Sequence, residues 1–290
     1  MATLKAIRRR ISSVKSTQQI TRAMKLVSAA RLRRAQEALL NARPYHESLK
    51  RVSDSLLGSS PEVMAPAENA QRVALILVVG SDRALCGGYN SNLLRMAEET
   101  ARRCVAEGIQ PKFFAVGRKP LDHFRRSKAT LDGDRVNNTP RLATVGLARD
   151  LAAKVITEFR SGAIIEAGVV YSAFRSAISQ HPTYDKLLPV EPPKPSEDGS
   201  TAPPTEYLIE PSPAELMPVV LRSYVEAAIF HALLEGEASE HGARMTAMDS
   251  ATNNAADMIS SLTLEMNRAR QAQITRELMD IVGGAEALRG

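Results

Sequence analysis

The chain has 290 residues, 44% of them hydrophobic, which is enough for one large domain or two ordinary ones and excludes a disordered or fibrous protein. Aromatic residues make up only 4% and tryptophan is absent, a composition that fits Ala-rich helical packing better than large packed sheets. The longest apolar run, Val73 to Val79, is far shorter than a membrane span of about 18 residues, so no segment is expected to cross a bilayer by itself.

The positive charge is concentrated in the first 57 residues. They hold 13 lysines and arginines against three acids, a net charge of +10, so the remaining chain carries −4 of the total of +6. No acid precedes Glu37, and an Arg-rich start without acids is also typical of a mitochondrial transit peptide. A basic arm can also bind nucleic acid, and such binding would weaken steeply with salt.

Residues from about 4 to 57 are predicted to form one long helix. Apolar and uncharged polar side chains recur there at alternating steps of three and four, which is a heptad seam for pairing with a second helix. The seam positions are Ile7, Ile11, Val14, Gln18, Thr21 and then Met24 or Lys25. Pro44 interrupts the pattern and is expected to kink the helix, at a cost of about 3 kcal/mol that packing offsets.

The middle of the chain alternates between strand and helix patterns. The expected strands are 72–79, 112–116, 129–136 and 163–172, and the expected helices are 91–107 and 142–160. This alternation predicts a small, mostly parallel α/β sheet layer inserted between two long helices. A Pro-rich segment, 189–213, is expected to be a stiff surface connection in which residues 207–209 could form a short edge strand.

No catalytic or cofactor-binding pattern is found. The first strand runs into Gly80–Asn90, where a dinucleotide-dependent enzyme would place its phosphate loop, but the glycine fingerprint is absent and the turn is interpreted as a backbone device. No nearby histidine supplies a base for Cys86, and neither the two cysteines nor the five histidines have metal-binding spacing. We therefore expect a non-catalytic protein without cofactor or metal, in a reducing compartment.

The last long helix is predicted to begin at a capping box, in which Ser212 and Glu215 bond reciprocally and Pro213 takes the first helical position. Pro218 is expected to kink or fray its first turn. A heptad seam follows at Met245, Met248, Thr252, Ala255, Ile259, Leu262, Met266, Ala269 and Gln273. At roughly 110 Å this helix would be far longer than an ordinary globular helix, and it would extend about 30 Å past the N-terminal one.

Four stretches resemble the gamma subunit of F-type ATP synthases: 11–24 (ISSVKSTQQITRAM), 81–87 (SDRALCG), 243–252 (ARMTAMDSAT) and 270–278 (RQAQITREL). The resemblance covers essentially the whole chain. Ala84 departs from the glycine usual in the family, which puts in doubt an unusual backbone angle in that loop, and Met266 replaces a common aromatic residue. The implied fold is α/β: a long antiparallel coiled coil of the terminal helices, residues 1–57 and 212–288, with an inserted Rossmann-like α/β domain, residues 70–210.

The resemblance implies a central rotor shaft that couples proton flow through the membrane sector to ATP synthesis or hydrolysis in an alpha/beta hexamer. The implied partners are the alpha, beta and epsilon subunits and the c-subunit ring, with one copy of the chain per complex. The implied location is peripheral, on the cytoplasmic face of the bacterial inner membrane. The resemblance also argues against a transit peptide, because the family's shaft begins with this basic helix. The alternative is a basic coiled-coil protein that binds nucleic acid.

Contact residues are carried over from the family by position. Those expected to meet beta subunits are Arg8, Arg9, Lys25, Arg33, Arg270, Gln271 and Thr275. Those expected at the helical tip, in a sleeve formed by the hexamer, are Leu278, Ile281, Val282 and Leu288. Those expected at the foot, near the c ring, are Tyr207 and Glu210.

Overall fold

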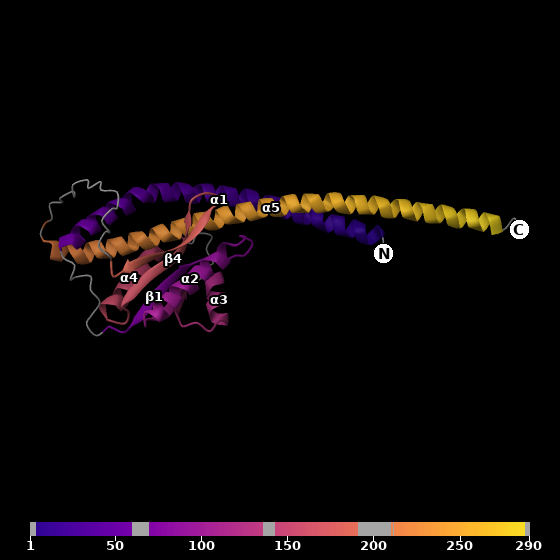
Figure 1. Ribbon diagram of the computed structural model, residues 1–290. Helices are drawn as coiled ribbons and strands as arrows, with labels where there is room; N and C mark the ends of the chain where they lie inside the picture. Colours follow the sequence, from indigo (N-terminus) through magenta and orange to yellow (C-terminus); the bar gives the residue numbers. More distant parts are fainter. Residues whose placement is uncertain (1–3, 60–69, 136–142, 191–209, 211, 288–290) are drawn as a thin grey trace, which may run out of the picture. The chain divides into compact units, whose positions relative to one another are not determined.

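The computed structural model describes residues 4–59, 70–135, 143–190, 210 and 212–287 (Figure 1). The helices are α1 (Leu4–Ser59), α2 (Tyr89–Ala106), α3 (Arg118–Arg126), α4 (Val145–Arg160) and α5 (Pro213–Ala287). The strands are β1 (Val73–Val79), β2 (Gln110–Val116), β3 (Leu131–Arg135), β4 (Glu166–Phe174) and β5 (Gln180–Leu188). The chain divides into two compact units, residues 1–27 with 245–290 and residues 28–244, and both long helices contribute to each.

The unit of residues 1–27 and 245–290 is an antiparallel helix pair. Thr252 Oγ1 donates to Thr21 Oγ1 at 2.8 Å, and Lys25 Nζ lies 2.6 Å from Asp249 Oδ1. A later residue of α1 thus pairs with an earlier residue of α5, so the two helices run in opposite directions. The predicted seam of α1 is confirmed, because its positions are the ones withdrawn from solvent between residues 4 and 25. The predicted seam of α5 is confirmed from Met245 to Ala269, whereas Gln273 is exposed.

The unit of residues 28–244 contains a five-stranded sheet in the order β3-β2-β1-β4-β5. The first four strands are parallel, and β5 pairs antiparallel with β4 along the edge. All seven residues of β1 are buried, as expected for a central strand covered on both faces. The mostly parallel sheet predicted from the alternating pattern and the Rossmann-like domain implied by the resemblance are therefore confirmed.

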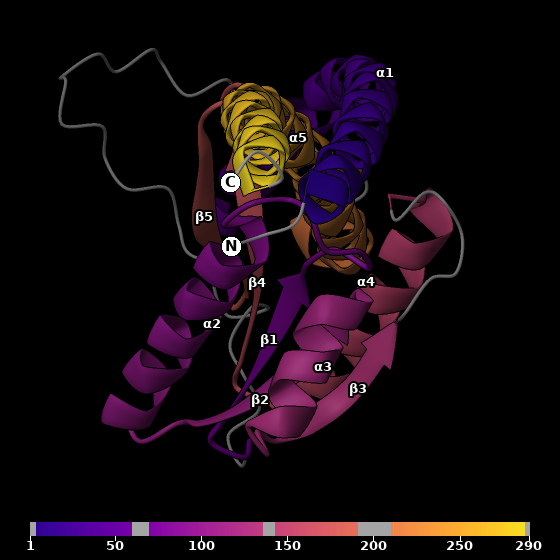
Figure 2. The ribbon, with the colours of Figure 1, turned by 90° about the vertical axis from the view of Figure 1, so that its right-hand side faces the viewer.

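Helices cover both faces of this sheet. On one face, side chains of α2 and α3 pack on alternate residues of β1 and on β2, and these helices lie in front of the strands in Figure 2. On the other face, α4 and the first half of α5 pack on the remaining residues of β1. The α5 stripe that reaches this core consists of Met217, Leu221, Val225, Ile229 and Leu233, spaced by four.

By length and composition alone, α5 contains one window apolar enough to cross a membrane. Its stripe from Met217 to Leu233 is, however, buried against the sheet, which is the position of a core helix. Of the residues in that window 39% are buried, so packing against the α/β layer accounts for part of its apolar character.

Two elements, α3 and β5, were not predicted from the sequence. Helix α3 is short and strongly charged, and β5 contains Pro182, which a central strand would not tolerate but an edge strand does. The expected edge strand at 207–209 lies outside the described residues, as does most of the Pro-rich segment. Helix α1 continues through Pro44 and α5 through Pro218.

The capping box at the start of α5 is confirmed with one difference. Ser212 Oγ accepts from the backbone N–H of Glu215 at 3.4 Å, as predicted. The Glu215 carboxylate, however, accepts from the Ser212 hydroxyl at 3.1 Å instead of from the Ser212 backbone N–H. Pro213 is the first helical residue, also as predicted.

We expect Gly168→Ala to lower the free energy of unfolding by about 1–3 kcal/mol, the usual cost of overpacking a core. A Cβ at this position of β4 would lie 2.3 Å from Cε2 of Tyr184. The ring cannot move away freely, because its hydroxyl donates to Glu166 and its face carries the Arg103 guanidinium. Urea unfolding of both proteins measures the difference. The matched control is Gly146→Ala in α4, where a Cβ meets nothing within 4 Å; a similar loss there would contradict the steric explanation.

Candidate functional site

The C-terminal part of α5 presents an exposed apolar stripe. Every side chain from 270 to 285 is exposed, and this part of α5 extends past the N-terminal end of α1 (Figure 1). Ile274, Leu278, Ile281 and Val282 are 45–68% exposed and follow one face of the helix at steps of three and four. Leu288, the fourth residue expected at the tip, lies outside the described residues.

This apolar stripe is not a continuation of the seam with α1. Continued past Gln273, the three-four steps of the seam reach Arg276 and Asp280, which are charged. Ile274 lies one residue after Gln273, and one residue turns a helix by about 100°. The stripe therefore faces away from the surface that meets α1, and a longer α1 would not cover it.

Three hydrogen-bonding side chains lie around the start of the stripe. Arg270, Gln271 and Thr275 are all exposed, so they are available to a partner as the sequence predicts. Gln271 and Thr275 are four residues apart and share a face, whereas Arg270 lies about 100° around the helix. Their contact with a partner remains a prediction.

The four basic residues expected to meet a partner from α1 have different surroundings. Arg8 and Arg9 are exposed. Lys25 is only partly exposed and pairs with Asp249, while Arg33 pairs with Glu37 at 3.1 Å on the surface of α1. Two of these four α1 residues are thus paired within the chain, which the sequence analysis did not foresee for Lys25 because Asp249 is distant in sequence.

At the expected foot, Glu210 is exposed, and Tyr207 lies outside the described residues. The role of this pair remains a prediction.

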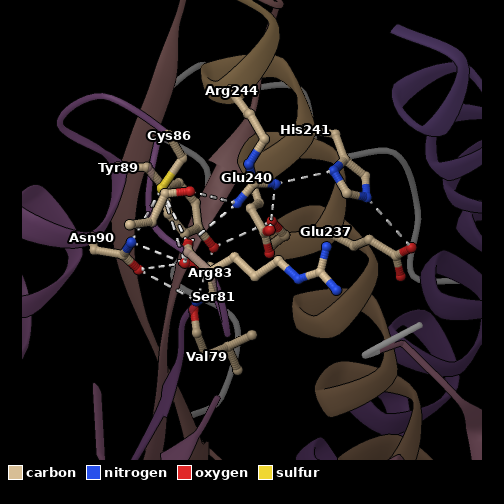
Figure 3. A network of polar contacts seen from close by, with 12 residues as sticks. Val79, Ser81, Arg83, Cys86, Tyr89, Asn90, Glu237, Glu240, His241 and Arg244 are labelled. Carbon is tan, nitrogen blue, oxygen red and sulfur yellow. Dashed lines mark hydrogen bonds and ion pairs between the residues drawn. The ribbon is translucent and has the colours of Figure 1, made fainter. Parts of the chain in front are cut away.

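A buried polar network joins α5 to the loop that follows β1 (Figure 3). At its centre lies Arg244, whose side chain is 8% exposed. Its Nη2 donates to the carbonyl oxygens of Arg83 at 3.2 Å and Ala84 at 3.4 Å. Its Nη1 donates to Glu240 Oε1 at 2.6 Å. One guanidinium thus binds two loop carbonyls and one carboxylate, a use that suits its fixed fork of donors.

The loop itself is ordered by short-range contacts. The Ser81 hydroxyl donates to the carbonyl of Arg83 at 2.8 Å, and Asn90 Nδ2 donates to the Ser81 hydroxyl and to the sulfur of Cys86. Leu85 has a φ of 67°, in the left-handed region that a leucine rarely adopts. The left-handed backbone angles of this loop therefore occur at Leu85 and at Gly87, where φ is 57°, and not at Ala84.

Burial determines the charges in this network. It lowers the pKa of His241 to about 4, with Arg244 and Arg31 acting in the same direction. It raises the pKa of Cys86 and, well above its ordinary value, that of Tyr89. A thiol with a raised pKa is a poor nucleophile, so the network lacks the activated group that covalent catalysis requires.

Further polar contacts fasten α5 to the start of α2 and to β4. The Tyr89 hydroxyl donates to the carbonyl of Gly236 at 3.2 Å, and the Ser239 hydroxyl donates to the carbonyl of Ser172 at 2.8 Å. A Cβ on Gly236 would lie 3.1 Å from Cγ1 of Val79, so glycine permits a close approach of helix and strand.

Helix α5 lies where a doubly wound sheet would bind a dinucleotide. In doubly wound sheets the ligand lies beyond the carboxyl ends of the strands at the switch point, here between β1 and β4. Gly236 of α5 lies against Val79, the last residue of β1, and Ser239 donates to Ser172 near the end of β4. The dinucleotide-dependent enzyme considered from the sequence is therefore not supported by the structure.

The sequence held a signal for this network that was not used. The buried stripe of α5 steps by four from Met217 to Leu233 and then, in the same phase, reaches Glu237, Glu240 and Arg244. Charged residues at positions where a helix faces its core indicate buried polar partners. Which loop supplies those partners is a question of tertiary structure that periodicity does not answer.

Comparisons with known proteins agree along the whole chain. The model of the ATP synthase family matches residues 3–288. The ATP synthase gamma chain of Pelotomaculum thermopropionicum is 47% identical, covering 99% of this chain and 100% of the relative. That of Geobacter metallireducens is 45% identical, covering 100% of both chains.

Solved structures share the fold. A chain in the Euglena gracilis mitochondrial ATP synthase (OSCP/F1/c-ring, rotational state 3) has a TM-score of 0.70 at 20% identity, covering 98% of this chain and 94% of that one. A chain in the central stalk/c-ring structure of the Tetrahymena thermophila mitochondrial ATP synthase has a TM-score of 0.61 at 24% identity, covering 80% of this chain and 99% of that one.

Proposed function

The chain belongs to the ATP synthase gamma chain family, and from this premise we propose that it is the central rotor shaft of such a complex. It couples proton flow through the membrane sector to ATP synthesis or hydrolysis in the alpha/beta hexamer by rotating within it. One copy serves each complex, with the epsilon subunit and the c ring as further partners. The chain has no catalytic role of its own, and catalysis takes place on the beta subunits.

The single observation that supports this role best is the exposed stripe of α5. An apolar stripe on one helix is normally covered, and this one is out of phase with the only helix paired to α5 in its unit of the described chain. A sleeve made by other subunits covers Leu278, Ile281 and Val282 without help from α1. A smooth apolar sleeve also allows the tip to rotate, because apolar contacts are not directional.

Rotation acts on the hexamer through differential contact. Arg270, Gln271 and Thr275 are directional groups just below the tip, so they bind one beta subunit at a time and favour one of its conformations. Arg8 and Arg9 on α1 add a basic surface for acidic partner loops. A shaft that binds three conformations unequally biases each in turn, which is the thermodynamic requirement for coupling.

The other end of the proposal concerns the membrane. Tyr207 and Glu210 are assigned to the foot near the c ring, and the complex to the cytoplasmic face of the bacterial inner membrane. The exposed position of Glu210 supports its availability to a partner.

Co-purification tests the function directly. A tag on this chain should bring down ATPase subunits at one copy of the chain per hexamer, and recovery of the chain without them would refute the proposal. A filter-binding assay with duplex DNA over a range of salt concentrations tests the nucleic-acid-binding alternative, which requires affinity that falls steeply with salt.

We expect the combined replacement of Arg270, Gln271 and Thr275 by alanine to reduce both steady-state ATP hydrolysis and proton pumping of the assembled complex. The loss of three hydrogen-bonding groups at about 0.5–1.5 kcal/mol each weakens the contact with the beta subunit. The measurement is the hydrolysis rate and the ATP-driven acidification of vesicles. Unchanged rates in a fully assembled complex would contradict the assignment of these residues.

A further inference from the structure

We propose that Arg244, held in place by Glu240, is the positioning residue that locks the 81–87 loop to α5, so that the α/β layer and the helix turn together under torque. This inference rests on the proposed rotor function. It assigns a mechanical role to a network inside the unit of residues 28–244 (Figure 3).

The apolar contacts between α5 and the sheet do not by themselves fix the rotation of the helix. The stripe from Met217 to Leu233 provides most of the burial, but apolar contact is non-directional and tolerates small sliding movements. Hydrogen bonds, by contrast, weaken steeply when their angle or length changes. Polar contacts are therefore the ones that set the register of α5 on the sheet. They include Glu226, which pairs with Arg149, and become frequent from Glu235 to Arg244.

Among these contacts, Arg244 has the strongest geometry for resisting rotation. It binds two successive carbonyls, those of Arg83 and Ala84, so the loop is held at two points instead of one. Its charge is balanced by Glu240 one turn earlier on the same helix, which keeps the guanidinium aimed at the loop. Both side chains are nearly buried, at 8% and 15% exposure, so water does not readily replace a broken contact.

The conformation of the loop supports a lock under tension. Leu85 follows directly after the two bound carbonyls and has a left-handed φ of 67°, which costs free energy and persists only when the surroundings impose it. Ser81 and Asn90 hold the two ends of the loop from the α/β side. Arg244 supplies the contact from the helix side, so removing it should release the loop from α5 while leaving the sheet intact.

The experiment compares Arg244→Gln with the wild type in complexes reconstituted into vesicles. We expect amide exchange in residues 81–90 to rise about tenfold, because buried charge-assisted hydrogen bonds are lost. We expect the number of protons pumped per ATP hydrolysed to fall as the opposing proton gradient is raised, since slip between helix and α/β layer grows with torque. A loss of assembled complexes alone would lower both rates equally at every gradient, and would overturn the proposal.

Two further variants sharpen the test. Arg244→Lys keeps the charge beside Glu240 but lacks the fork, so its deficit under load should be intermediate; it also serves if Arg244→Gln fails to assemble. The matched control is Arg135→Gln, which breaks an exposed pair with Asp150 and should match the wild type at every load. Unchanged exchange, or coupling that stays at the wild-type value under load in both Arg244 variants, overturns the proposal. Failure of the wild-type chain to assemble with ATPase subunits would instead refute the rotor function itself.

Discussion

Ala255→Pro should uncouple ATP hydrolysis from proton movement in assembled complexes that still bind nucleotide. Ala255 lies on the seam of the helix pair and is 7% exposed. A proline there removes one backbone hydrogen bond and clashes with the carbonyl of Ala251, at a cost of about 3 kcal/mol or more. The pair should open locally and lose the continuous hydrogen-bond ladder that lets it resist twisting.

The measurement is the ratio of ATP-driven acidification to hydrolysis in vesicles, with circular dichroism to check that the remaining helix is intact. Val145→Pro is the matched control, because Val145 is the first residue of α4 and needs no intrahelical donor. Thr144 before it already has the extended conformation, with φ −127° and ψ 144°, that a following proline requires. Normal pumping by the Ala255→Pro complex would mean that this helix pair does not bear the torque.

Acidification should destabilise the unit of residues 28–244 through His231. Its ring stacks on that of His46 with centroids 4.6 Å apart, joining α1 to α5. Burial lowers the pKa of His231 to about 4, and the neighbouring His46 and Arg43 act in the same direction. In the unfolded chain His231 has a pKa near 6.5, so between pH 6.5 and 4 it is protonated in the unfolded state and neutral in the folded state. The free energy of unfolding is therefore unaffected by this group above pH 6.5 and decreases as the pH falls towards 4. The maximum loss is roughly 3 kcal/mol, since each pKa unit corresponds to about 1.4 kcal/mol.

His231→Phe tests this linkage, because it keeps an aromatic ring for stacking and removes the titrating group. Urea unfolding at several pH values between 7.5 and 4.5 should show a shallower fall in stability for the variant than for the wild type. Glu235 faces His231 and its pKa is raised by burial, which has the opposite dependence on pH, so the difference between the two proteins is the informative quantity. His181→Gln at an exposed position of β5 is the control and should follow the wild-type curve. Parallel curves for His231→Phe and the wild type would contradict the prediction.

Regular features were predictable because they depend on neighbours in sequence. The three-four spacing identified the seam positions of both helices, from Ile7 on α1 to Ala269 on α5, and Ser212 with Glu215 marked the start of α5. The alternation of strands and helices gave the parallel sheet. These signals arise from backbone geometry that repeats every few residues, so a single sequence is sufficient to detect them.

The features that were missed depend on contacts between distant residues. Arg244 binds carbonyls 161 and 160 positions earlier in the chain, and backbone carbonyls leave no mark in the sequence. The sequence did not show that Lys25 pairs with Asp249 within the chain, and its contact with a partner subunit stays a prediction. Strand β5 was missed because Pro182 reads as a strand breaker unless its position at the sheet edge is known.

The exposed end of α5 has a mechanical consequence beyond binding. From Arg270 onward the shaft is a single helix about 25 Å long, whereas further back two interlocked helices share any twisting load. Elements under the same torque behave as springs in series, and the most compliant element takes up most of the twist. The solitary helix is thus the softest spring of its unit. Torque enters this helix only as far as Arg270, Gln271 and Thr275, because the apolar sleeve lets the tip turn. Its first turns therefore twist more per residue than the helix pair behind them, and they store part of each rotational step as elastic strain.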